Sequence, residues 1–185
     1  MYRITGKIQG VAPILFSHWT EEAEKSIREG TTGGKFSDDQ RMQEAMQKVY
    51  LNEQGDLTLP NWNFKKCLLE GCRKAGLKEG RASMSPFLEA TVFVDAELSF
   101  GVQAPDFIHE VTGKRPPRTG GACLIKRPAL NAGWSLPFSL SVVDDRRSAD
   151  HIRRALEEAG LLVGLGSWRP EYGRFVVTEW QRQSA

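Results

Sequence analysis

The order of apolar patterns along the chain predicts a single α+β domain over residues 1–185, with strands and helices in the order βαββαβ. Three observations support this prediction: an alternating strand pattern at the N-terminus, a long amphipathic helix pattern in the middle, and a helix, loop and strand pattern at the C-terminus. Hydrophobic residues make up 40% and charged residues 26% of the 185 positions, which is typical of a globular domain with a substantial core.

The composition argues against several classes of protein. The three cysteines are odd in number and form no Cys-x-x-Cys pair, which disfavours a disulfide framework or a zinc site. No apolar run approaches the length of a membrane span, and the first residues lack the layout of a secretory signal. We therefore expect a cytoplasmic protein with no metal, no cofactor and no membrane partner. The net charge of +2 permits a nucleic-acid partner without arguing for one.

The first strand is expected over residues 2–10, where apolar and polar residues alternate. Pro13 in the following apolar run predicts a bend or an edge strand. An insertion is then predicted over residues 20–60, made of a mobile segment, a helix capped by Ser37 and a small hairpin. The helix of the insertion is expected to bury one apolar stripe: Met42, Ala45, Met46 and Val49.

The strongest helix pattern begins at Asn61, the expected N-cap, and ends before Gly76. Its apolar residues recur on one helical face: Phe64, Cys67, Leu68, Gly71, Cys72 and Ala75. Lys65 and Lys66 lie beside this face near the helix start. They form either a solvated basic surface or part of a track for phosphates, and the sequence leaves both open.

A strand is predicted over residues 91–99, and a long basic loop over residues 101–121. Prolines and glycines near the end of this segment are unfavourable inside a sheet. Its cations would suit either a flexible arm over a phosphate backbone or a solvated linker: Lys114, Arg115 and Arg118. Two further strands are predicted over residues 122–127 and 136–142.

The C-terminal part begins with a helix capped by Ser148 and expected to stop at Gly160. A short buried strand over residues 161–165 and a final strand from Phe175 complete the predicted order.

A glycine-rich loop precedes the final strand. Three glycines give it a backbone that other groups can approach closely: Gly164, Gly166 and Gly173. Its aromatic and arginine side chains could stack on bases and pair with phosphates: Trp168, Arg169, Tyr172 and Arg174. The alternative is an ordinary turn with Trp168 packed into the core.

Two segments resemble the RAMP superfamily of CRISPR proteins. Leu59-Pro-Asn-Trp-Asn-Phe-Lys-Lys-Cys-Leu-Leu69 is similar to the proline-led, lysine-bearing start of the first helix in that superfamily. Gly164-Leu-Gly-Ser-Trp-Arg-Pro-Glu-Tyr-Gly-Arg-Phe175 is similar to its C-terminal glycine-rich loop. The βαββαβ order agrees with the ferredoxin-like or RRM fold of these proteins.

The resemblance implies a non-catalytic protein that binds single-stranded RNA or DNA, RNA preferred. It would act in antiviral defence as a backbone-like subunit of a CRISPR effector, in contact with copies of itself or with partner protein subunits. A phage or mobile-element protein that reuses the fold for protein interactions is an alternative.

Catalysis is a further alternative, because one branch of the superfamily cuts RNA without a metal. Such cleavage needs a general base, and His18, which follows the first strand region, is the best candidate. His109 in the predicted long loop comes next, whereas His151 in the first turn of a helix fits a local structural role. The sequence shows no partner for any of the three, so the non-catalytic hypothesis is favoured.

Overall fold

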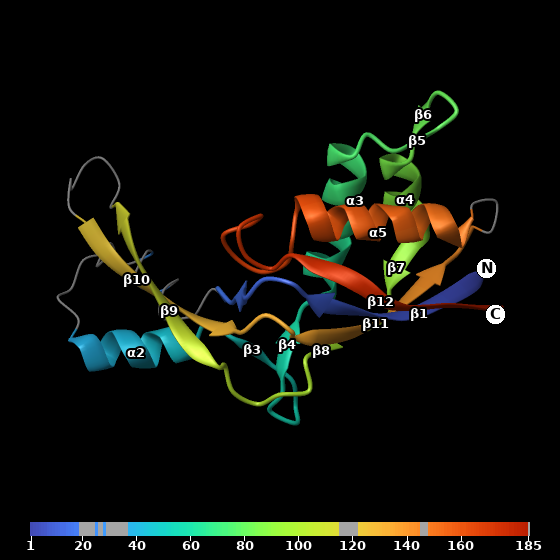
Figure 1. The fold of residues 1–185 in the computed structure, drawn as a ribbon. Helices are drawn as coiled ribbons and strands as arrows, with labels where there is room; N and C mark the ends of the chain where they lie inside the picture. Colours follow the sequence, from blue (N-terminus) through green and yellow to red (C-terminus); the bar gives the residue numbers. More distant parts are fainter. Residues whose placement is uncertain (19–24, 26–27, 29–36, 115–121, 145–147, 185) are drawn as a thin grey trace.

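The computed structural model describes residues 1–18, 25, 28, 37–114, 122–144 and 148–184. Its main sheet is antiparallel, with the strand order β12-β1-β11-β7. These strands are β1 (Tyr2–Gly10), β7 (Val92–Val94), β11 (Ser135–Val142) and β12 (Phe175–Ser184). Helices α3 (Asn61–Lys74) and α5 (Ala149–Leu162) lie together over one face of this sheet (Figure 1).

The α+β class is therefore confirmed. The four strands of the main sheet and its two helices occur along the chain in the order βαββαβ, with further elements between them. The core lies between the main sheet and its two helices. Alternate residues of β1 and β11 are buried there, as the period of a strand requires. The ring of Phe138 on β11 lies 5.2 Å from that of Phe64 on α3 and 6.0 Å from that of Trp180 on β12, measured between ring centroids.

The ends of two helices differ from those predicted. Asn61 is the first residue of α3 rather than its N-cap, and no side chain caps this end. α5 continues through Gly160, where a Cβ atom would lie 2.2 Å from the carbonyl oxygen of Phe175, so this glycine serves close packing rather than termination. The left-handed residue after the helix is Gly164, with φ +79°. The strand predicted over 161–165 is wrong, because the start of this segment belongs to α5.

The single strand predicted over residues 91–99 is divided between two sheets. Helix α4 (Ser85–Thr91), which the sequence pattern did not predict, leads directly into β7. β8 (Leu98–Ser99) then pairs with β4 (Leu57–Leu59) in a second sheet. Val92 and Leu98, at the two ends of the alternating pattern, are buried as predicted. Ala96, which lies between them, is exposed.

The predicted hairpin of the insertion is present as β3 (Tyr50–Leu51) and β4, which pair in the second sheet. The side-chain oxygen of Asn52 accepts hydrogen bonds from the backbone N–H groups of Gln54 and Asp56, which shapes the turn between them. A small separate hairpin is formed by β5 (Lys78–Glu79) and β6 (Ala82–Ser83).

A long hairpin of β9 (Phe107–Lys114) and β10 (Ala122–Leu130) extends away from the main sheet, at the end opposite to the two chain termini (Figure 1). Near its base, β10 also pairs with β2 (Ile14–Leu15). The loop predicted over residues 101–121 is therefore wrong for residues 107–114, where the chain pairs along β10. Arg115 and Arg118 lie outside the described residues.

Helix α2 (Asp38–Met46) packs against β10 and begins as predicted, with Ser37 and Gln40 forming a capping box. The predicted apolar stripe is only partly buried. Ala45 is fully buried, whereas Met42 and Met46 are exposed, because the helix covers one side of a narrow hairpin rather than a broad sheet. The mobile segment predicted before this helix lies outside the described residues, apart from positions 25 and 28.

A buried lysine joins α2 to the hairpin. The side chain of Lys126 on β10 is 3% exposed, and its Nζ lies 2.8 Å from a carboxylate oxygen of Asp38 and 2.9 Å from one of Glu110. Hydrogen bonds to the carboxylates raise the pKa of Lys126, and the bond to Asp38 has a larger effect than the bond to Glu110. A buried cation paired on two sides holds α2 in a defined place on the hairpin, because losing either carboxylate would leave its charge underpaired.

The contact between α3 and α5 gives a test of the fold. A Cβ atom on Gly71 of α3 would lie 2.4 Å from the Cα of Ala159 on α5. We expect Gly71→Ala to lower the free energy of unfolding by about 1–3 kcal/mol, because the helices would have to separate. Urea unfolding measures this change. Lys66→Ala, an exposed position on the same helix, is the control and should change stability by less than about 0.5 kcal/mol. A more stable Gly71→Ala variant would contradict the close packing of the helices.

Candidate functional site

The glycine-rich loop, residues 163–174, lies against residues 11–15, which form β2 and the link that precedes it. The backbone N–H of Gly173 donates to the carbonyl oxygen of Pro13 at 2.7 Å, and that of Ser167 donates to Leu15 at 2.9 Å. The N–H of Val11 donates in the other direction, to Arg174 at 2.9 Å. These bonds join backbone to backbone, so the loop is positioned by the chain itself rather than by its side chains.

Glycine is required at two of these contacts. A Cβ atom on Gly173 would lie 1.8 Å from the carbonyl oxygen of Leu165, and one on Gly166 would lie 2.5 Å from that of Leu15. Both glycines also have left-handed backbone angles, with φ of +76° and +75°. The sequence predicted that these glycines let another group approach the backbone closely. In the structure, the group that approaches them is the protein's own backbone, at Leu15 and Leu165.

Four side chains from the loop and the hairpin form a cluster, which we call the aromatic cluster: Trp168, Tyr172, His109 and Arg127. The ring of His109 on β9 lies 5.7 Å from that of Trp168 and 5.1 Å from that of Tyr172. The guanidinium of Arg127 on β10 lies 4.9 Å from the centre of the Trp168 ring, within range of a cation–π interaction. Trp168 and Tyr172 are each partly exposed, so they are not core residues.

Polar contacts fix the cluster further. The hydroxyl of Tyr172 lies 3.2 Å from Nε2 of His109, and the guanidinium of Arg127 donates to the hydroxyl oxygen of Ser167. Partial burial lowers the pKa of Arg127. His109 and Arg127 face each other across β9 and β10, so both side chains leave the hairpin on the side of the glycine loop.

Trp168 has a left-handed backbone, with φ +57°, which is strained for a residue with a bulky side chain. Its carbonyl oxygen accepts a hydrogen bond from the N–H of Tyr172 at 3.2 Å, and the preceding residue is bound to β2. Backbone strain of this kind persists only when the surroundings hold it, and it is concentrated at functional sites. Here it holds an aromatic ring partly exposed next to a cation.

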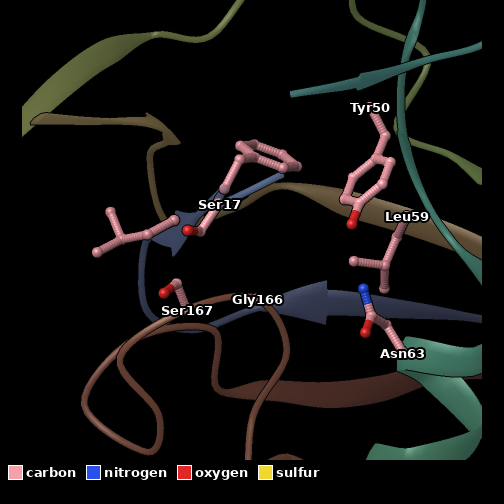
Figure 2. Close-up of a pocket in the computed structure, with 8 residues that line it drawn as sticks. Ser17, Tyr50, Leu59, Asn63, Gly166 and Ser167 are labelled. Atoms are coloured by element: carbon pink, nitrogen blue, oxygen red, sulfur yellow. The ribbon is translucent and has the colours of Figure 1, made fainter. Parts of the chain in front are cut away.

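A polar pocket lies beside the loop (Figure 2). Its lining comes from the end of β2, from β3 and β4, from the start of α3 and from the glycine loop: Leu15, Phe16, Ser17, Tyr50, Leu59, Asn63, Gly166 and Ser167. His18 stands next to it, with its ring centroid 4.2 Å from that of Tyr50 and its backbone N–H bonded to the carbonyl of Lys48 at 2.8 Å. Burial raises the pKa of the Tyr50 hydroxyl.

The two lysines of α3 lie in different surroundings. The Nζ of Lys65 donates to the backbone carbonyls of Leu88, at 2.5 Å, and Val92, so this side chain joins α3 to α4 and β7. Lys66 is exposed. Neither belongs to the aromatic cluster, and Lys65 already uses its ammonium group within the protein.

The two arginines of the loop also differ. Arg169 points back to α3, where its guanidinium lies 3.6 Å from a carboxylate oxygen of Glu70. Arg174 is exposed next to β12, and within the described part of the chain no ion pair is recorded for it. Lys114 ends β9, at the far end of the hairpin. The cations proposed from sequence thus lie at several places, and the cation that does join the cluster, Arg127, was not among them.

The open face of the main sheet offers little for stacking. On the two central strands, the residues that alternate with the buried ones carry no aromatic ring: Arg3, Thr5, Lys7, Gln9, Ser135, Pro137, Ser139 and Ser141. Two of the charges are also paired, because Arg3 lies 3.4 Å from Asp95 and Lys7 lies 3.6 Å from Glu179. The two central strands therefore provide no ring for base stacking. Exposed or partly exposed rings lie instead in the loop and hairpin, and at Trp62 on α3 and Phe93 on β7.

The described residues show neither a candidate metal site nor a helix that could span a membrane. The described part of the chain contains no group of three or more His, Cys, Asp or Glu side chains arranged to hold a metal ion. Within the same residues, none of the helices combines the length and the apolar character needed to cross a lipid bilayer.

Comparison with known proteins identifies similar folds among solved structures. No protein-family model and no curated protein matches the chain. Among solved structures, the chain is similar to a subunit in the cryo-EM structure of a Type III-B Cmr-β complex bound to cognate target RNA, with a TM-score of 0.57 and 13% sequence identity. The match covers 99% of this chain and 61% of that chain, so this protein spans less than two thirds of the other's length. At this identity the comparison establishes a shared fold.

The position of Lys65 gives a test by pH. Burial lowers the pKa of its amine to about 8, and the carboxylate of Glu89 opposes this shift. A lysine in the unfolded chain titrates near 10.5. Between these values the unfolded chain binds more protons than the native protein, so this group makes the protein more stable as pH rises.

We therefore expect wild type to gain free energy of unfolding relative to Lys65→Met as the pH rises from about 8 to about 10. Urea unfolding at several pH values measures the difference, and Lys66→Met controls for loss of a lysine from the same helix. A difference that stays constant, or that moves in the opposite direction, would show that Lys65 is not held in this environment.

Proposed function

We propose that the protein is a RAMP-type subunit with a ferredoxin-like core, and that it binds single-stranded nucleic acid, with a preference for RNA, without cutting it. It would serve in the cytoplasm as a backbone-like component of a CRISPR effector. Support comes from two independent sources. One is the fold shared with a chain of an RNA-bound Cmr complex. The other is the resemblance of the start of α3 and the glycine loop to segments of that superfamily.

The aromatic cluster is the observation that carries this proposal. Trp168 and Tyr172 offer partly exposed rings for stacking, and Arg127 supplies a positive charge beside one of them. Single-stranded nucleic acid is bound by this combination, because every base has a flat face and every linkage has a phosphate. The loop that carries the two rings is fixed by backbone hydrogen bonds, so little conformational entropy is lost when a strand binds.

Assembly with other subunits is part of the same proposal. The fold neighbour is a chain of a Type III-B Cmr-β structure bound to cognate target RNA. In this chain, large apolar side chains are exposed on α3 and on the edge strand β7, where Trp62 is 54% exposed and Phe93 is 51% exposed. Surfaces of this kind suit contact with a neighbouring subunit. They lie on the main sheet and its helices rather than at the aromatic cluster.

A binding assay tests the proposal directly. Fluorescence anisotropy with single-stranded RNA, single-stranded DNA and duplex of one sequence should rank RNA first. Its affinity should fall with salt at a log–log slope of about −0.7 for each phosphate engaged. Trp168→Ala should weaken RNA binding by about tenfold or more, because one base–aromatic stack contributes roughly 1–3 kcal/mol. Trp62→Ala removes an exposed tryptophan of α3 and is the matched control. The monomeric Trp62→Ala protein should bind RNA with the affinity of wild type.

Arg174→Ala separates charge from stacking. This change should reduce the magnitude of the salt slope by about 0.7 and weaken binding to all sequences alike. Arg153→Ala on α5, an exposed arginine paired with Glu157, should leave the slope unchanged. If wild type binds neither RNA nor DNA at low salt, the proposal fails. A stable protein complex in a pulldown would then favour the alternative of an interaction protein from a phage or mobile element.

Metal-independent RNA cleavage through His18 is the second candidate function. The observation in its favour is that His18 lies against Tyr50, which lines the pocket beside the glycine loop. Its weakness is that the described residues provide no carboxylate bound to the His18 ring. Wild type should therefore leave structured RNA intact in EDTA. Cleavage that His18→Ala abolishes, with His151→Ala as the matched control, would establish the enzyme instead.

A further inference from the structure

The pocket beside the glycine loop has a lining suited to one kind of ligand, and we propose that it holds a single unstacked base of the bound strand. This inference rests on the proposed function and extends it by naming the part of the nucleic acid that the pocket receives. The pocket has a volume of about 270 Å³. This is close to the lower end of the roughly 300–1,000 Å³ typical of small-molecule sites, which suits a ligand the size of a base.

The lining is polar but uncharged. Three hydroxyls and one amide contribute hydrogen-bonding groups, and three side chains are apolar: Ser17, Tyr50, Ser167, Asn63, Leu15, Phe16 and Leu59. Among the described residues that line it, none is a lysine, arginine, aspartate or glutamate. The guanidinium of Arg127 lies behind Ser167 and over the ring of Trp168, so a phosphate finds its counter-charge outside the pocket rather than within it. A neutral, planar base with donors and acceptors on its edge fits both the apolar and the polar parts of the lining.

The polar groups of the pocket have unused hydrogen-bonding capacity. Within the described residues, no hydrogen bond is recorded for the hydroxyl of Tyr50, the side-chain amide of Asn63 or the hydroxyl of Ser17. Figure 2 shows Tyr50, Leu59 and Asn63 on one side of the pocket, with Ser17 and Ser167 on the other. An amide offers both a donor and an acceptor, which is what recognition of a base edge requires.

Neighbouring residues hold this lining in place. The ring of His18 packs on Tyr50. The hydroxyl of a tyrosine carries its proton at neutral pH, and burial raises the pKa of Tyr50 further, so this group can donate a hydrogen bond. Asn63 is in the first turn of α3, on a rigid element. The hydroxyl of Ser167 already accepts from Arg127, so its own proton is free to turn toward a ligand.

The pocket is also continuous with the aromatic cluster. Ser167 lines the pocket and immediately precedes Trp168, and Arg127 contacts both residues. A strand with one base stacked on Trp168 and a phosphate near Arg127 would carry a neighbouring base to the mouth of the pocket. Stacking outside and hydrogen bonding inside would then act on successive nucleotides of one strand.

Photochemical cross-linking tests this placement. The full-length protein is bound to single-stranded RNA that carries one 5-iodouridine, and the substituted position is moved stepwise along the strand. Irradiation followed by mass spectrometry of the peptides maps the contact. At one position we expect a cross-link to Tyr50 or Phe16. Cross-links found only at Trp168 and Tyr172, with none in the pocket at any position, would overturn this inference and leave the proposed function standing.

Base preference gives the second test. Wild type is titrated with single strands of adenylate, cytidylate or uridylate of equal length. We expect it to prefer one of them, and Tyr50→Phe or Asn63→Ala to reduce that preference roughly three- to tenfold, which corresponds to one lost hydrogen bond. Asn131→Ala, at an exposed asparagine, is the matched control.

Thermal unfolding of each variant establishes that it is folded. If wild type binds the three strands equally, or if both pocket variants keep the wild-type ratios, the inference is overturned. If wild type binds none of them, this inference and the proposed function fall together.

Discussion

The backbone contact between the glycine-rich loop and the chain at residues 13–15 determines where the other parts of the site lie. Gly173 and Ser167 donate to carbonyl oxygens of this segment, at Pro13 and Leu15. Because Gly166 also touches Leu15 with no room for a Cβ atom, the two chains approach as closely as backbones can. The loop therefore has one position relative to β1, and it brings the aromatic rings to the hairpin on one side and closes the polar pocket on the other.

The hairpin of β9 and β10 is the second half of the site, and its two faces contact different parts of the protein. Glu110 and Lys126 are paired across the strands and face α2, where the buried lysine is neutralised. The next pair, His109 and Arg127, faces the opposite way and meets the glycine loop. Because side chains alternate along a strand, helix packing and contact with Trp168 are built into neighbouring residues without interfering with each other. A shift of one residue in the register would exchange these two environments.

The sequence predicted the elements whose signals are local and missed those set by distant contacts. The N-caps Ser37 and Ser148 are present, because a capping side chain acts within its own helix turn. Gly160 failed as a helix stop, because its role is to admit Phe175 from another element. In the site, the glycines identified the loop, but Arg127 was missed because its partner Trp168 lies 41 positions further along the chain. They meet because β10 pairs with β2, and the backbone N–H of Ser167 in the loop is bonded to Leu15 of β2. The prolines after residue 114 also concealed the hairpin that places His109 beside Arg127.

The hairpin also has a consequence for chain length. It belongs to one excursion that leaves the main sheet after β7 and returns at β11, and these two strands are direct neighbours, with Val94 opposite Leu140. Since the excursion starts and ends at adjoining strands, residues can be added to it or removed from it at small entropic cost and without reordering the sheet. The same sheet can therefore support proteins of very different size.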